Sequence, residues 1–134
     1  MDEATVHEAA ERFVAFLETG TPPPGLFADD VFCDFTMPLW RLQAQGVDGV
    51  VALRREGHPS AGEVRRWRCD VTPSGFVIEF EEHWEQGGQR WYSREMARAD
   101  LVAGAISELS IYCTGDWDEA RQTRHGRDVV LVRP

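Results

Sequence analysis

Glu82 is the carboxylate in this sequence whose neighbours most favour acid–base chemistry. It falls between Phe80 and Trp84, in a run where apolar residues alternate with polar ones. Alternate residues of a strand share a face, so Glu82 is predicted on the face that the aromatic residues would bury. An apolar pocket there would raise its pKa and make it a general acid or base, with Phe80 and Trp84 contacting the substrate. The alternative is an edge residue that faces water.

Arg94 and Glu95 are a second charged pair, in the run that follows. Because they are adjacent in a predicted strand, they must face opposite sides, and one of them points inward. An inward Glu95 would lie on the strand next to Glu82, and two close carboxylates split their pKa values into one acid and one base. An inward Arg94 would instead pair with a carboxylate and keep it ionised. Arg94 and Met96 are also candidate substrate contacts.

Tyr112 and Asp34 are the other candidates for direct chemistry. Tyr112 lies near the end of the last strand-like run, where its phenol could donate to a developing oxyanion. It could equally be a core tyrosine bonded to a backbone carbonyl. Asp34, between Cys33 and Phe35, could enter the pocket as an alternative base to Glu82, or it could face solvent. One β-bulge would reverse the face that any of these residues occupies.

His58 and Trp40 are candidates for the rim of a pocket. His58 follows a predicted helix and could lie at the pocket edge. Trp40 follows Met37-Pro38-Leu39 in the sequence, where a loop could close the pocket mouth and stack on a flat ligand. Either residue could instead have no part in binding.

No motif for metal, phosphate or acyl-transfer chemistry is evident. The His, Cys, Asp and Glu residues lack recognised metal-ligand spacings, and Gly46–Gly49 lacks the lysine of a phosphate loop. Cys33, Cys69 and Cys113 are odd in number and lie in apolar runs, so they are predicted to be reduced and buried. We therefore expect neither a metal nor an organic cofactor.

The second half of the chain is predicted to be an antiparallel meander on which everything else packs. Three strand-like runs follow one another between Phe76 and Trp117. Gly87-Gly88 suits a tight hairpin between the first two runs, and Gly104 turns the chain again before the third.

The first half predicts helices followed by strands. Apolar residues at spacings of three and four indicate an amphipathic helix over Ala4–Glu18, which Gly20 and three prolines end. The remaining elements are a helical turn at Gly25–Ala28, a strand in residues 31–38, a helix over Gly46–Gly57 and a strand over Val64–Thr72. One or two helical turns after Trp117 and a short strand or extended tail complete the chain.

Composition limits the class of protein. A chain of 134 residues with 43% hydrophobic residues suits one domain, residues 1–134. The formal net charge of −9 argues against nucleic acid as a partner, so Arg65, Arg66 and Arg68 are expected on a solvated strand edge. No apolar run approaches the roughly 20 residues that a membrane helix needs, and the N-terminus is unlike a secretory signal. A soluble, cytoplasmic protein is expected.

The order of elements and three segments resemble the NTF2-like superfamily, and within it the SnoaL-like polyketide-cyclase group. The segments are LFADDVFCDF, GVDGVVALR and GAISELSIYCTGDW, and the resemblance spans nearly the whole chain. It implies an α+β, cystatin-like cone, with a strongly curved antiparallel sheet wrapped on about three N-terminal helices. It also implies an apolar pocket at the wide end of the cone.

Ketosteroid isomerase, limonene-epoxide hydrolase and scytalone dehydratase are members of that superfamily. The resemblance implies catalysis without metal or cofactor, by carboxylates, tyrosines or histidines around a hydrophobic substrate. However, Asp34 lies one place from the position of the isomerase base, and Ser110 stands where the hydrolase has an arginine. Neither reaction is therefore assigned.

Two hypotheses follow from the residues and the resemblance together. The first is a cofactor-independent acid–base enzyme acting on a small hydrophobic, polyketide-like or terpenoid molecule by cyclisation, isomerisation, dehydration or hydrolysis. The second is a module that binds a small ligand, or dimerises, without chemistry. In either case a homodimer through the outer face of the sheet is expected.

Overall fold

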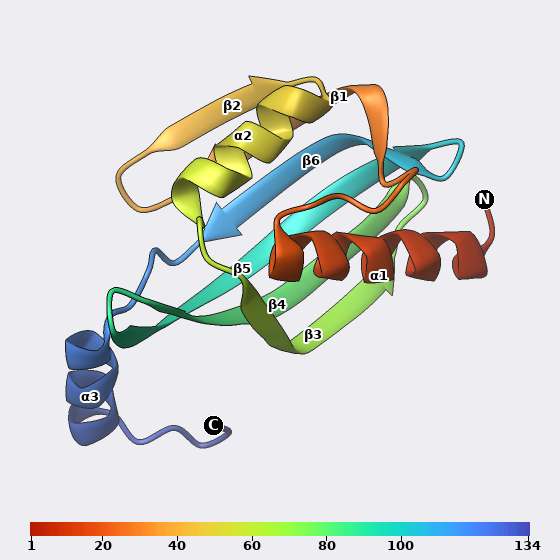
Figure 1. The fold of residues 1–134 in the computed structure, drawn as a ribbon. Coiled ribbons are helices and arrows are strands. Elements are labelled where there is room, and N and C mark those ends of the chain that lie inside the picture. The colour runs from red at the N-terminus through yellow and green to blue at the C-terminus, as the bar shows by residue number, and fades with distance from the viewer.

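A curled six-stranded sheet carries two helices on one face in the computed structural model, which describes residues 1–134 (Figure 1). The strands lie in the order β2-β1-β6-β5-β4-β3. Their bounds are β1 Phe27–Thr36, β2 Arg41–Gln45, β3 Gly62–Val71, β4 Gly75–Gln86, β5 Gln89–Val102 and β6 Ala105–Cys113. Helices α1 (Glu3–Thr19) and α2 (Val47–Gly57) cover the inner face, whereas α3 (Glu119–Asp128) lies beyond the end of the sheet.

Helix α1 forms where the apolar periodicity predicts it. The Asp2 side chain accepts a hydrogen bond from the backbone N–H of Thr5 at 2.8 Å, which caps the first turn. Gly20 ends the helix in the left-handed conformation at φ 76°. The buried stripe packs on the sheet and consists of Val6, Ala9, Ala10, Phe13, Val14, Phe16 and Leu17.

The meander is confirmed, and its register decides which side chains point inward. Phe76, Ile78, Phe80, Glu82 and Trp84 of β4 share the inner face. On β5, Phe80 pairs with Glu95, Glu82 with Ser93, and Trp84 with Trp91. Paired residues of antiparallel strands share a face, so Glu95 points inward and Arg94 outward.

Several predicted details are wrong. Strand β2 was not predicted, because only Leu42 and Ala44 alternate with its polar residues. The sheet is mixed rather than antiparallel, since β1 pairs in parallel with β6. Residues 25–28 form no helical turn, because β1 begins at Phe27.

The helices before the meander differ in number from those expected. Two helices, α1 and α2, precede it instead of about three, whereas the helical turns predicted after Trp117 are present as α3. The tail after Asp128 is extended and forms no strand. None of the three helices combines the length and the apolar character needed to cross a membrane.

Candidate functional site

Glu82 lies in the interior, as its place in the alternating run predicts. Only 3% of its surface is exposed. Both of its carboxylate oxygens accept hydrogen bonds from Arg54 of α2, which donates from Nη1 to Oε2 at 3.1 Å and from Nη2 to Oε1. Burial alone would raise the pKa of Glu82, but the charge and hydrogen bonds of Arg54 outweigh it and lower that pKa. Glu82 is therefore an ionised partner in a buried ion pair, and the expectation that its pocket raises its pKa is wrong.

Glu95 is the second buried carboxyl group, and its pKa is shifted in the opposite direction to that of Glu82. It is 6% exposed, and its pKa is raised well above the usual value by burial and then by the charge of Glu82. Its Oε1 accepts hydrogen bonds from Ser93 Oγ at 2.8 Å and from Cys113 Sγ at 3.4 Å. Its Oε2 has no hydrogen-bond partner. The raised pKa of Glu95 favours its protonated form, whereas Arg54 keeps Glu82 ionised.

His58 joins this pair from the end of α2. Burial, followed by the charge of Arg54, lowers its pKa to about 4, so the imidazole is neutral at pH 7. Its ring packs edge-on against Trp84, with ring centroids 4.4 Å apart. Its Nε2 lies 3.8 Å from Oδ1 of Asp116, whose own pKa is raised by burial and by the charge of Glu82.

We call Arg54, His58, Glu82 and Glu95 the central cluster. One ligand atom from each of His58, Glu82 and Glu95 lies within 4.8 Å of the others, a spacing that could hold a metal ion. The donor set fits a cation poorly, because Arg54 holds both oxygens of Glu82 and the raised pKa of Glu95 disfavours the ionised form that binds a cation. The arrangement suits proton transfer better.

Two apolar hollows meet at His58. A cavity of about 50 Å³ lies between the helices and the sheet, and Arg54 and His58 form the polar part of its wall. A second hollow of about 230 Å³ opens to the surface, and we call it the mouth. Its walls are Phe35, Met37, Leu42, Leu53, Glu56, Gly57, His58 and Asp116. Ligand pockets commonly measure about 300–1,000 Å³, so the interior is smaller than a polycyclic molecule needs.

Phe80 and Trp84 point inward, but neither lines the cavity or the mouth. Phe80 is fully packed, with its ring 6.0 Å from that of Phe13 in an edge-on contact. Trp84 lies between His58 and Trp91, whose ring is nearly parallel to its own. Phe80 therefore supports the core, and Trp84 supports His58.

Four candidates lie on the outer face of the sheet, away from the central cluster. Tyr112 is 62% exposed and Met96 is 46% exposed, and they pair across β6 and β5. Arg94 faces outward, 3.8 Å from Glu81. Asp34 accepts two hydrogen bonds from Arg41, which lower its pKa. The structure therefore does not bring Tyr112 or Asp34 to the interior where Glu82 lies.

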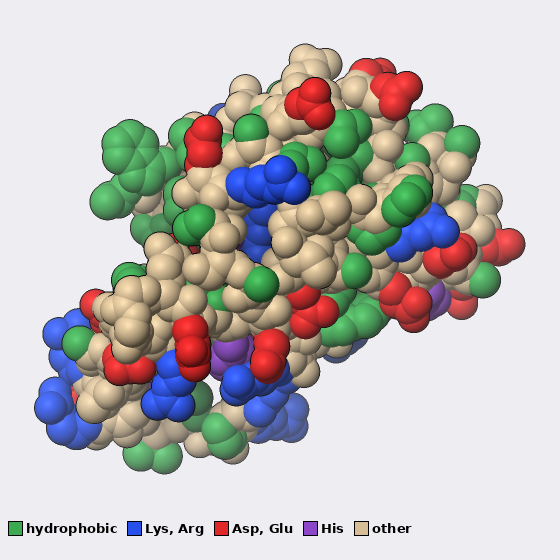
Figure 2. Space-filling model, in the orientation of Figure 1, with side chains coloured by type: hydrophobic (Ala, Val, Ile, Leu, Met, Phe, Trp, Pro, Cys, Tyr) green, Lys and Arg blue, Asp and Glu red, His purple; other side chains and the backbone are tan.

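Trp40 lies at the tip of the β1–β2 turn and is 65% exposed. Apolar side chains protrude from the molecule at this turn (Figure 2). Met37 and Leu42, on either side of Trp40, line the mouth, but Trp40 does not. Of the two rim candidates, the structure places only His58 in the site.

Arg54 is the residue that the sequence reasoning missed. It comes four residues after the buried Val50 on α2, so both lie on the helix face turned to the sheet. A charged residue in an apolar helical stripe is the same signal that singled out Glu82 in its strand. Ser93, Cys113 and Asp116 were also missed, and nothing in their local pattern indicates their roles.

Solved structures show the same arrangement of helices and sheet. An NTF2-like protein from Anabaena variabilis ATCC 29413 matches with a TM-score of 0.70 at 18% identity, over 84% of this chain and 89% of that chain. The chain has an NTF2-like fold. The fold expected from the resemblance is thus confirmed. No protein-family model matches the sequence, and no curated protein matches it.

Two other structures share the NTF2-like fold with this chain. A phenazine biosynthesis-related protein from Pseudomonas aeruginosa has a TM-score of 0.65 at 14% identity, covering 98% of this chain and 91% of that one. An LEH-like epoxide hydrolase from M. tuberculosis has a TM-score of 0.65 at 16% identity, covering 82% and 83%. At such identities only the fold carries over, since one fold hosts many activities.

Proposed function

We propose that this NTF2-like protein is a cofactor-independent acid–base enzyme acting on a small hydrophobic molecule that enters through the mouth. The central cluster holds a neutral histidine, a carboxyl group of raised pKa and an ionised carboxylate. Groups whose environments drive their pKa values apart are typical of acid–base sites. The LEH-like epoxide hydrolase is an enzyme with the same fold, which supports this class of function.

The burial of a second carboxyl group, Glu95, close to Glu82 and His58 is the observation that carries the proposal. An Arg54–Glu82 ion pair alone would suffice to join helix and sheet. A second buried carboxyl group beside it adds a desolvation cost, and burial and the charge of Glu82 raise the pKa of Glu95. A protein that retains such a group beside a neutral buried histidine gains a proton donor and a proton acceptor.

The roles follow from which atoms reach the hollows. His58 lines both the cavity and the mouth, so its imidazole is the group that takes a proton from the substrate. Arg54 lines the cavity, and its buried Nε–H has no hydrogen-bond partner. This N–H can therefore stabilise an oxyanion that forms as the proton leaves. Glu82 holds Arg54 in place, and His58 returns to the substrate the proton that it took, so that the imidazole is neutral again.

The hollows favour a substrate of about one ring. The cavity of about 50 Å³ and the mouth of about 230 Å³ are apolar apart from a few groups. A cyclic ketone with an acidic α-hydrogen places its oxygen toward Arg54 Nε and its ring among the apolar side chains. We therefore propose a single-ring carbonyl compound rather than a polycyclic substrate.

The test is hydrogen–deuterium exchange at the α-carbon of cyclohexanone in D₂O, followed by NMR. The wild-type protein should accelerate exchange, and His58→Gln should reduce the acceleration by about 100-fold, the usual contribution of a general base. Asp34→Asn, on the outer face, is the matched control and should retain full activity. Equal exchange by the wild type and His58→Gln would refute the assigned role.

The second candidate is a non-catalytic ligand-binding module. The nearly filled interior favours it, because Phe13, Phe76 and Phe80 occupy much of the space inside the cone. Saturable binding of cyclohexanone without any exchange would support this alternative over the enzyme.

A further inference from the structure

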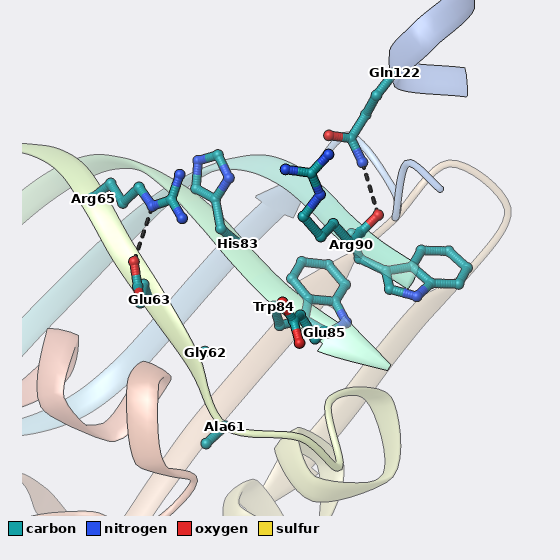
Figure 3. A pocket seen from close by; sticks show the side chains of 10 residues that line it. Ala61, Gly62, Glu63, Arg65, His83, Trp84, Glu85, Arg90 and Gln122 are labelled. Carbon is teal, nitrogen blue, oxygen red and sulfur yellow. Dashed lines mark hydrogen bonds and ion pairs between the residues drawn. The ribbon is translucent and has the colours of Figure 1, made fainter. Parts of the chain in front are cut away.

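The largest hollow of the molecule lies outside the central cluster. It has a volume of about 510 Å³ and lies where the start of β3 meets the β4–β5 hairpin and α3 (Figure 3). We call it the hairpin groove. It shares no wall residue with the cavity or the mouth, and it is lined by Ala61, Gly62, Glu63, Arg65, His83, Trp84, Glu85, Arg90, Trp91 and Gln122.

One wall of the hairpin groove is aromatic and rigid. The rings of Trp84 and Trp91 are inclined by only 10°, with centroids 6.3 Å apart. The Trp91 indole N–H donates to the Gln86 carbonyl at 3.1 Å, which fixes that ring. Gly62 faces Trp84 across the strand pair, and any Cβ there would lie 2.7 Å from the His83 carbonyl oxygen. The backbone of β3 thus approaches closely and leaves the groove open at this point.

The opposite rim carries guanidinium groups with free donors. Arg65 and Arg90 extend along this rim with His83 between them (Figure 3). Arg65 donates from Nε to Glu63 at 2.9 Å, and Nε of Arg90 lies 3.5 Å from Glu119. The terminal nitrogens of both arginines make no hydrogen bond within the chain, so each can bind a carboxylate.

The charges around the groove restrict the kind of anion. Glu63 and Glu85 line it together with the two arginines. Their negative charges offset part of the attraction for an anion, and the penalty is greatest for a doubly charged group. A singly charged carboxylate is therefore favoured over a phosphate monoester.

We propose that the hairpin groove binds a planar aromatic carboxylate. Its ring packs on the half-buried indole of Trp91, which the buried Trp84 supports from the other side, and aromatic pairs gain energy beyond the area they bury. Its carboxylate accepts hydrogen bonds from the terminal nitrogens of Arg65 and Arg90. The groove is a ligand site separate from the acid–base site, and it needs no chemistry at His58.

The test uses 1-naphthoate as the probe, with binding followed by calorimetry and by the indole N–H signals in NMR. Saturable binding that shifts the Trp91 signal is expected. Arg65→Gln and Arg90→Gln should each weaken binding by about fivefold, the value of one exposed ion pair. Trp91→Leu should weaken it by about tenfold through the lost ring contact.

Two probes and two variants complete the design. Cyclohexanecarboxylate lacks the flat ring and 1-naphthalenemethanol lacks the charge, and both should bind more weakly than 1-naphthoate. Arg98→Gln is the matched control, because Arg98 is as exposed as Arg65 and also pairs with an acid of its own strand. Glu95→Gln should leave naphthoate binding unchanged, which separates this site from the proposed enzyme.

Absence of saturable naphthoate binding would overturn the proposal. So would equal weakening by Arg98→Gln, or binding that shifts only residues lining the mouth. Tighter binding of naphthyl phosphate than of naphthoate would refute the preference for a singly charged ligand.

Discussion

Glu95 lies in an environment that opposes its ionisation. This environment makes the stability of the folded protein depend on pH. Its pKa is raised in the folded protein, so above about pH 4.5 the folded state binds more protons than the unfolded chain. The contribution of Glu95 to stability is complete below that pH and declines as the pH rises. Glutamine resembles the protonated carboxyl group and can still accept from Ser93.

Glu95→Gln should therefore gain stability relative to the wild type as the pH increases from 5 to 8. Urea unfolding at the two pH values measures the difference. Asp34→Asn, at a carboxylate of lowered pKa on the outer face, should show no such gain. If the Glu95→Gln difference were the same at both pH values, Glu95 would not be held protonated.

His58 should give the stability of the folded protein a pH dependence of the opposite sign to that of Glu95. Its folded-state pKa of about 4 lies below the unfolded value near 6.5. Between these values the unfolded chain binds more protons, so the stability due to His58 is lost as the pH falls from 6.5 to 4. The loss amounts to at most about 3 kcal/mol.

His58→Gln should remove that part of the pH dependence. Denaturant unfolding at pH 4.5 and pH 7 compares this variant with the wild type and with His7→Gln, a change at an exposed histidine of α1. The destabilisation caused by His58→Gln should be larger at pH 7 than at pH 4.5. A His58 imidazole that titrates near pH 6.5 by NMR would contradict the assignment.

At the scale of elements, the Arg54–Glu82 pair is the polar connection between α2 and β4. Removing one partner leaves a buried charge unpaired, which typically destabilises a protein by about 3–5 kcal/mol. Arg54→Met should therefore be strongly destabilising, and Arg54→Met with Glu82→Gln should recover part of the loss. Chemical unfolding of the single and double variants measures the coupling.

Arg55→Met is the matched control on the same helix. The exposed Arg55 donates to the Gly20 carbonyl, and losing that contact should cost less than about 1 kcal/mol. Equal destabilisation by Arg54→Met and Arg55→Met would mean that the pair does not connect the two elements.

A long periodic pattern in the sequence predicts a helix or strand well. It also predicts which side of the sheet each side chain points to, but only up to the next β-bulge. The alternation around Glu82 is unbroken, so its inward orientation was predictable. In β6 the buried Ile106 and Leu109 are three residues apart, and the β5–β6 register shifts there. That irregularity places Tyr112 on the opposite face from the one that counting from Ile106 gives. The parallel β1–β6 pairing joins distant segments, and no local pattern reveals it.

At the scale of the whole molecule, the outer sheet face is the surface on which we propose that two copies meet. Met96 and Tyr112 are largely exposed there and line a shallow hollow of about 330 Å³. Around them, acids and arginines pair within the face, including Asp34 with Arg41 and Arg98 with Asp100. The face is thus locally balanced in charge despite the net charge of −9.

If two copies meet at this face, two substitutions at its centre should halve the mass of the protein in solution. The wild type should sediment at twice the chain mass, and Met96→Glu with Tyr112→Glu should sediment at the single-chain mass with its fold intact. Stable interfaces bury roughly 800 Å² per partner, so charges at the centre of the face should be decisive. Val130→Glu introduces the same charge on the exposed tail and should remain dimeric.

Because the central cluster lies on the inner face, the monomeric variant should keep the pH dependence due to His58 and Glu95. A wild type at the single-chain mass would contradict the interface and leave the acid–base site unaffected.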